Sequence, residues 1–288
     1  MTAAATSPLA ALAAENLDRL RAAHPAAFDD RRRLVLGAAA AAAVVGLAAF
    51  ALWYLDFSIL AIWNGVGRLG GFLVLMIPPS PDRYLWTYLQ AMAETVGIAY
   101  LGTLVAAIIA FPFGFLAARN VIPNVFVHVG VRRFLDTLRG VDTLIWALIW
   151  VSVVGLGPFA GVLAIICSDI GAFGKLFSEA IETADRRPVE GVISAGGSRL
   201  AGHRFGILPQ IVPVMVSQVL YYFESNTRSA TIIGIVGAGG IGIPLAEAIR
   251  TLELQQVAFL VLMILVVVTV IDLVSSRIRF AVIGKPAH

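Results

Sequence analysis

Long uncharged apolar runs dominate the hydrophobic pattern of this chain. Four runs of at least about 18 residues contain no Asp, Glu, Lys or Arg, and a fifth run just reaches that length. A helix of about 20 apolar residues crosses the ~30 Å hydrocarbon core of a bilayer. Because such runs satisfy their backbone groups within lipid only as helices, they predict an all-α membrane protein. The runs are residues 34–55, 95–118, 143–168, 205–223 and 254–271.

The first 90 residues contain one predicted span and one ambiguous apolar segment. Residues 1–33 form a tail, either an amphipathic helix or a disordered segment, and the run after it is too long for a cleaved signal peptide. Residues 59–77 are apolar, yet Arg68 lies at their centre, and a central Arg costs about 2.5–3.5 kcal/mol on insertion scales. We therefore expect residues 34–90 to form a first transmembrane helix and an outer interfacial segment, with a spanning helix over 59–77 as the alternative.

The remaining runs predict five further spans, which gives about six transmembrane helices. The second span covers about residues 94–117. A run over 134–178 is too long for one helix, so Gly155 to Pro158 divide it into two spans joined by a tight turn. The last two spans cover about 210–224 and 256–275. The predicted parts are a helical core over 91–279, a polar loop within it over 179–209, and a tail over 280–288.

The distribution of basic residues tests this topology. Of the 21 Lys and Arg residues, seventeen fall in the N-terminal tail, the loop between the second and third spans, the polar loop and the C-terminal tail. Cytoplasmic loops carry an excess of Lys and Arg. The sequence therefore predicts a multi-pass protein of the inner membrane, with both termini and the polar loop in the cytoplasm.

Composition and motifs argue against a catalytic, metal-binding or cofactor-binding site on this chain. Charged residues make up 14% of it and hydrophobic residues 59%, so lipid must solvate much of its surface. No phosphate-binding loop of the Gly-x-x-x-x-Gly-Lys-Ser/Thr type occurs, the four His residues are scattered, and the single Cys167 lies in an apolar run. We therefore expect no catalytic residue, no metal site and no bound cofactor. A secondary transporter is a rival class, but we find no internal repeat of the kind it would predict.

The polar loop contains a short amphipathic pattern. Pro188 suits the first turn of a helix, and Glu190 complements the positive end of that helix. Apolar residues then recur at helical spacing as far as Leu200, and Gly196 on the same face would let another backbone approach closely. We expect a helix over residues 190–200. The periodicity leaves open whether this helix lies on the bilayer or docks a partner.

A polar and Gly-rich segment follows the fourth run, which contains the fifth predicted span. Its glycines satisfy the spacing of a dinucleotide-binding loop, but membrane spans flank them and no acidic residue follows at about 20 positions, which argues against nucleotide binding. Close helix packing through small residues is one interpretation, and irregular backbone that lines an aqueous cavity is the other. The candidate pathway or gate residues are Glu224, Asn226, Thr227, Arg228, Ser229, Gly237, Gly239, Gly240 and Gly242.

Arg228 is the strongest of these candidates for contact with a solute, because a cation facing a water-filled path would attract an oxyanion. Asn226, Thr227 and Ser229 could donate hydrogen bonds beside it. The structural alternative is an ion pair with Glu224, which lies four residues earlier and on the same face if the helix continues. Both interpretations stay open, and they do not exclude each other.

Both segments carry motifs of a known family. Glu190, Gly196 and the Leu208-Pro209 pair lie at the offsets of the cytoplasmic signature of ABC importer permeases, which the polar loop resembles. The pattern from Asn226 to Gly242 is similar to the branch of these permeases for phosphonates, which is close to the branch for methionine. The resemblance covers about residues 91–279. It implies a type I importer permease fold with one extra N-terminal span.

The resemblance also implies a function and an assembly. The chain would form a translocation pathway between two copies of itself for phosphonates, phosphite or phosphate, with methionine or another small solute as the alternative. Its partners would be two cytosolic ATPase subunits that bind ATP and Mg, an external substrate-binding protein and membrane lipid, but no nucleic acid. The glycines from Gly234 to Gly242 would lie near the outer gate. The residues implied in ATPase coupling are Glu190, Gly191, Val192, Ala195, Gly196, Leu200, Leu208 and Pro209.

Overall fold

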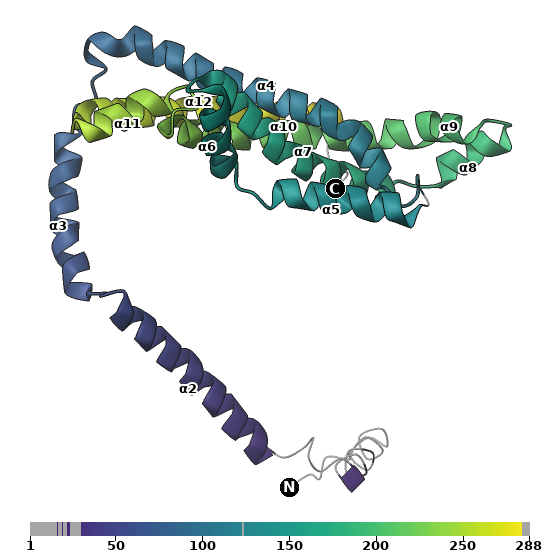
Figure 1. Ribbon diagram of the computed structural model, residues 1–288, viewed down its shortest axis with the longest axis horizontal. Coiled ribbons are helices and arrows are strands. Elements are labelled where there is room, and N and C mark those ends of the chain that lie inside the picture. Colours follow the sequence, from purple (N-terminus) through teal and green to yellow (C-terminus); the bar gives the residue numbers. More distant parts are fainter. Residues whose placement is uncertain (1–15, 17–18, 20–21, 24–29, 123, 284–288) are drawn as a thin grey trace, which may run out of the picture. The chain divides into compact units, whose positions relative to one another are not determined.

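The computed structural model describes residues 16, 19, 22–23, 30–122 and 124–283, and the regular elements over these residues are all helical. The predicted all-α class is therefore confirmed. Most of the predicted N-terminal tail and residues 284–288 lie outside the described residues. Figure 1 shows the elements in chain order. They are α2 (Asp30–Tyr54), α3 (Ile59–Leu75), η2 (Asp82–Tyr84), α4 (Leu85–Ala117), α5 (Val125–Arg139), α6 (Thr143–Val154), α7 (Pro158–Thr183), α8 (Arg187–Ser194), α9 (Arg199–Gly202), η3 (His203–Ile207), α10 (Leu208–Ile235), α11 (Gly242–Arg250) and α12 (Leu254–Ile283).

The first of two compact units ends at Leu69, within α3. From Leu34 onward α2 is apolar on all sides, and its segment Leu34–Tyr54 is long and hydrophobic enough to cross a bilayer. A helix segment that is hydrophobic all round belongs in apolar surroundings, in agreement with the predicted first transmembrane helix. α3 is 17 residues long and contains Arg68. The interfacial position of residues 59–77 stays a prediction.

Small residues on α4 permit close contact with α7 in the second unit. Gly102, Ala106, Ala110 and Gly114 recur every four residues and are buried on one face of α4. A Cβ on Gly102 would lie 2.7 Å from the Ile165 side chain of α7, so only glycine fits this contact. Lipid tails are as apolar as the protein interior, and helices in a membrane therefore associate through close packing of this kind. This stripe of small residues holds α4 against α7.

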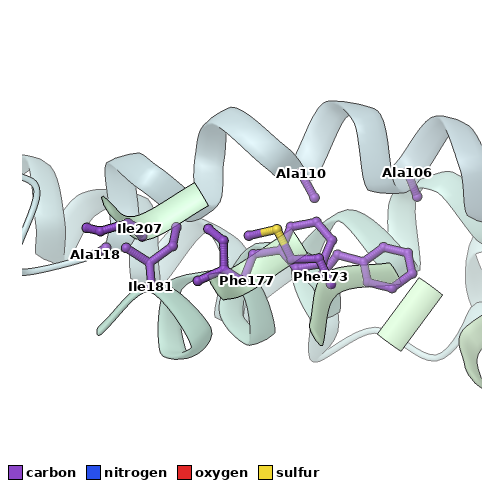
Figure 2. Packing of buried hydrophobic residues seen from close by; sticks show 9 residues of the cluster. Ala106, Ala110, Ala118, Phe173, Phe177, Ile181 and Ile207 are labelled. Carbon is purple, nitrogen blue, oxygen red and sulfur yellow. The ribbon is translucent and has the colours of Figure 1, made fainter. Parts of the chain in front are cut away.

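Aromatic side chains of α7 fill the space beside the stripe (Figure 2). Phe173 and Phe177 are buried, and their rings stack with centroids 5.4 Å apart. They share one cluster with Ala106 and Ala110 of α4 and with Ile207, which directly precedes α10. An aromatic pair contributes about 0.5–1.5 kcal/mol beyond the area that it buries. α4, α7 and the start of α10 thus have a common core.

The predicted third span is wrong as a single straight helix. α5 and α6 meet at an angle of 83°. Gly140 ends α5, and the Asp142 carboxylate caps α6 by accepting a hydrogen bond from the Leu144 N–H at 2.8 Å. α6 alone has 12 residues, about 18 Å of helix, which is too short to cross a bilayer. Among the described residues, five helices are long and apolar enough to span, or six if the bent pair counts as one span.

Three helix boundaries extend past the predicted ones. α4 begins at Leu85 rather than near residue 94, α10 continues without a break to Ile235, and α12 continues to Ile283, past the predicted end of the core at residue 279. Charge-free runs underestimate the lengths of α10 and α12. Charged side chains on these two helices pair with one another, so both helices continue through them. The predicted break at residues 155–158 does separate α6 from α7.

Candidate functional site

The polar loop forms a helical hairpin instead of the single helix predicted over residues 190–200. α8 ends at Ser194, the backbone of Gly196 has a φ of +86°, and α9 begins at Arg199. This left-handed conformation favours glycine, so Gly196 turns the chain and does not lie on a helix face. The apolar residues recur at helical spacing across the turn, which explains why periodicity predicted one continuous helix. The hairpin and α11 lie at opposite ends of the second unit (Figure 1).

The apolar side chains of the hairpin divide into a packed set and an exposed set. Val189 occupies the space beside Gly206, where a Cβ would lie 2.8 Å from the Val189 side chain. Ile193 and Leu200 are exposed, and Leu200 keeps 78% of its surface accessible. Exposed apolar side chains on a polar hairpin suit contact with a partner. Of the predicted coupling residues, Glu190, Gly191 and Val192 lie on α8, Ala195 and Gly196 in the turn, Leu200 on α9, and Leu208 and Pro209 in the first turn of α10.

A charged cluster interrupts the apolar surface of α10. The Arg228 guanidinium lies 2.9 Å from the Glu224 carboxylate, which is the ion pair expected if the helix continues. Arg279 of α12 lies 3.9 Å from Glu224 and 3.7 Å from Asp272. The Glu224 side chain is only 12% exposed, whereas the Arg228 side chain is 50% exposed. Glu224 is therefore held between two cations, and Arg228 keeps half of its side-chain surface available for contact.

Asn226 and Thr227 face the interior of the helix bundle, although both were expected to lie beside a solute. The Asn226 amide donates hydrogen bonds to Thr103 Oγ1 of α4 at 2.8 Å and to Asp169 Oδ2 of α7 at 2.5 Å. Thr227 is buried, and Ser229 is half-buried. Buried side chains of one copy cannot contact a solute outside it. The structure narrows the polar pathway candidates on α10 to Glu224, Arg228 and Ser229, and it makes Asn226 a tie between three helices.

Replacing Asn226 by Leu is expected to lower the thermal unfolding midpoint of the purified permease, because Asp169 and Thr103 lose their buried partner. Leaving a buried polar group unpaired costs about 1–3 kcal/mol. The matched control is Gln218→Leu on the same helix, where the side-chain oxygen finds no partner among the described residues. Equal midpoints for the two variants would show that the Asn226 hydrogen bonds add nothing to stability.

The Gly-rich segment forms a tight loop between α10 and α11. Gly237, Gly239 and Gly240 have φ angles of +94°, +87° and +76°. Ala238 between them is buried, and the Gly157 N–H at the start of α7 donates a hydrogen bond to the Gly237 carbonyl at 2.9 Å. Within one copy of the chain, the loop is thus packed against protein. Close packing through small residues describes the loop within one copy, and its position beside a cavity between copies stays a prediction.

Two side chains of α4 complete the hydrogen bonding of this loop. The Glu94 carboxylate accepts a hydrogen bond from the Gly240 N–H at 2.8 Å, and the Thr95 hydroxyl accepts one from the Ile241 N–H at 2.7 Å. Irregular backbone at membrane depth requires internal partners of this kind. The partners are 146 residues apart in the chain, so local sequence patterns did not link them.

Other chemistry has little support in the described part of the chain. Its His, Cys, Asp and Glu side chains form no group of three or more that could hold a metal ion. Helix α10, rather than a strand, precedes the Gly-rich loop, which differs from the strand-loop-helix arrangement of dinucleotide sites. Cys167 is a half-buried free cysteine of α7.

Comparison with known sequences gives one family match and several relatives. Residues 110–283 match the family described as "Binding-protein-dependent transport system inner membrane component". The chain is 34% identical over 239 residues to the phosphite transport system permease protein PtxC of Stutzerimonas stutzeri. This alignment covers 83% of this chain and 86% of that protein. It is 37% identical over 236 residues to the phosphate-import permease protein PhnE of Mycolicibacterium smegmatis. This second alignment covers 82% of this chain and 44% of that protein.

Comparison with solved structures concerns the fold. An inward-facing structure of the MetNI methionine ABC transporter contains a chain that superposes with a TM-score of 0.63 at 17% sequence identity. The match covers 70% of this chain and 99% of that chain. At this identity the likeness says nothing about the solute. The predicted type I importer permease fold is confirmed.

Proposed function

We propose a solute and an assembly on one premise, which is that this chain belongs to the family of binding-protein-dependent transport system inner membrane components. The chain is therefore a permease subunit of an ABC importer and a transport component rather than an enzyme. It lies in the inner membrane, which it crosses with several helices. Its family also implies a separate ATPase and a substrate-binding protein as partners.

The proposed solute is a phosphorus oxyanion such as phosphite, phosphate or a phosphonate. One observation carries this proposal: relatives named for phosphite transport and phosphate import align with more than four-fifths of this chain. The half-exposed Arg228 side chain agrees with it. A guanidinium donates paired, charge-assisted hydrogen bonds to oxyanions, and it stays charged at every physiological pH.

The proposed importer contains two copies of this chain, two ATPase subunits that bind ATP and Mg, and one external binding protein. The chain has one α8–α9 hairpin, so an ATPase with two nucleotide sites requires two chains for two couplings. Closed two-fold symmetry is also the commonest arrangement of oligomers. Lipid solvates the exposed apolar side chains of the spanning helices. The excess of basic residues supports cytoplasmic termini and a cytoplasmic hairpin.

The hairpin and the Gly-rich loop have separate roles in this proposal. Ile193 and Leu200 of the hairpin enter a groove of the ATPase, and Leu208 and Pro209 transmit its movement to α10. Glycines 237, 239, 240 and 242 fix the far end of α10 against α4 and α7, which supports the outer gate from within each copy. Arg228 and Glu224 lie on the helix that joins these two ends.

Replacing Arg228 by Gln is expected to lower ATP-driven phosphate uptake about tenfold or more, which corresponds to loss of one charge-assisted hydrogen bond. Arg279 still faces Glu224 in this variant, so the loss would not arise merely from an orphaned carboxylate. The measurement uses proteoliposomes that contain the whole importer, labelled phosphate, and unlabelled phosphite, methylphosphonate or methionine as competitors. Phosphite or methylphosphonate should compete with phosphate, whereas methionine should not.

The controls for this experiment are Glu224→Gln, the double variant and Arg277→Gln, which removes an exposed cation of α12. Arg277→Gln should transport like the parent. Normal uptake by Arg228→Gln, or recovery of uptake in the double variant, would show that Arg228 only neutralises Glu224. Competition by methionine alone would contradict the proposed solute class.

A further inference from the structure

A cavity of about 270 Å³ lies at the hairpin end of the second unit, between the end of α4, helix α5 and helix α7. Its lining includes Arg119, His128, Arg132, Asp136 and Lys175. The cavity is separate from Arg228 and from the Gly-rich loop, and neither the transport pathway nor the coupling hairpin uses it. In the proposed topology this end faces the cytoplasm.

The cavity has an excess of positive charge. Four cationic side chains line it, and two carboxylates pair with them: Glu182 lies 2.8 Å from Arg132, and Asp136 lies 3.2 Å from Lys175 and 3.4 Å from Arg133. Pairing therefore leaves a surplus of two positive charges around one concave site. Like charges in a confined space repel one another, and an anion between them removes that repulsion.

His128 positions one of these cations at the cavity. The Arg119 guanidinium donates from Nε to His128 Nε2 at 3.0 Å. Because Arg is always protonated, His128 Nε2 must be the acceptor, and the imidazole proton then lies on Nδ1. His128 is 5% exposed, and its Nδ1 finds no partner among the described residues. A buried N–H without a partner costs about 1–3 kcal/mol, but Nδ1 has almost no accessible surface, so the part of His128 that serves the cavity is Nε2, which holds the Arg119 guanidinium.

We infer that this cavity binds a phosphate-type oxyanion, held by the charges of Arg119, Arg132 and Lys175, with His128 positioning the Arg119 guanidinium. Guanidinium and ammonium groups are donors suited to the several acceptor oxygens of a phosphate group. The phosphate group can belong to free inorganic phosphate or to an anionic phospholipid headgroup. Apolar side chains on the exposed surface of α5, including Phe126 and Val129, suit acyl chains if a lipid is the source. The inference does not depend on which solute the importer carries.

The test compares Arg119→Gln and Lys175→Gln with Arg277→Gln, which removes one exposed charge outside the cavity. In one arm, the purified permease–ATPase complex is titrated with inorganic phosphate by calorimetry. In the other arm, native mass spectrometry counts the phosphatidylglycerol molecules retained after purification from lipid nanodiscs. Thermal midpoints of all variants show whether each is folded. If Arg119→Gln does not fold, Lys175→Gln alone provides the test.

Either cavity variant should weaken binding about tenfold or more in at least one arm, while Arg277→Gln binds like the parent. A calorimetric signal that the cavity variants lose and Arg277→Gln keeps identifies free phosphate as the source, and lipid retention that follows the same pattern identifies a headgroup. Absence of binding in both arms would overturn the inference. Equal losses in all three variants would also overturn it, because they would show an effect of net charge alone.

Discussion

Replacing Gly242 by Ala is expected to deplete folded permease from the membrane and to lower uptake in proportion. A Cβ at this position would lie 2.3 Å from the Thr231 carbonyl oxygen and 2.6 Å from the Gly234 carbonyl carbon. Both atoms belong to the backbone, so no side chain can rotate away. Overpacking typically costs about 1–3 kcal/mol, and we expect a loss at or above the upper end of that range. The amount of folded protein after detergent extraction and its thermal midpoint measure the effect.

Gly97→Ala is the matched control for this prediction. Gly97 lies within α4, and a Cβ there would meet nothing within 4 Å. Because Ala favours the helix over Gly by up to about 1 kcal/mol, this variant should be as stable as the parent or more stable. If Gly242→Ala extracted and melted like Gly97→Ala, the contact between α10 and α11 would not be needed for folding.

Replacing Leu200 by Asp is expected to release the ATPase from the permease and to reduce uptake to background. Leu200 is exposed on α9 of the hairpin, so the fold of the hairpin does not depend on this side chain. Burying a Leu side chain contributes about 1.5–3 kcal/mol, and a buried unpaired carboxylate costs more, so affinity should fall by about a hundredfold or more. Native mass spectrometry of the purified complex measures ATPase retention, and the same spectra count the permease copies.

Leu252→Asp controls for the loss of an exposed leucine. Leu252 is 68% exposed, lies between α11 and α12, and has a φ of +59°, a conformation in which Asp is tolerated. This variant should keep the ATPase. Gly196 is less suitable for the test than Leu200, because its left-handed backbone would be strained by any side chain. Normal ATPase retention and uptake by Leu200→Asp would refute the coupling role of the hairpin.

The sequence predicted the fold well where the structure of a helix depends only on residues within that helix. Charge-free runs located the spanning helices, and Gly155 to Pro158 located the turn before α7. It failed where a short local feature breaks an apolar run, as at Gly140 and Asp142, or where pairing lets a helix continue through charge, as at Glu224 and Arg228. Hydropathy records the cost of isolated charges, but it does not record the partners that reduce this cost.

The candidate site was predictable to a similar extent. The predicted coupling residues from Glu190 to Leu200 lie in one hairpin and Leu208 and Pro209 begin α10, while their coupling role stays a prediction. The spacing of Glu224 and Arg228 predicted their ion pair. The burial of Asn226 could not be predicted, because it depends on Thr103 and Asp169, which lie on other helices. The cavity beside His128 escaped detection for the same reason, since its cations come from three separate segments.

The bonds between the Gly-rich loop and α4 also constrain how the protein is made. Glu94 and Thr95 emerge from the ribosome 146 residues before the loop amides that they bind. While the later helices insert, the first part of the chain is therefore already in the membrane, and the Glu94 and Thr95 side chains of α4 lack their loop partners. Contacts this distant in sequence close late, because the entropy of a long loop must be overcome first. Completion of this end of the permease thus waits for synthesis of the loop before α11, and a chain that stalls before residue 240 lacks both hydrogen bonds.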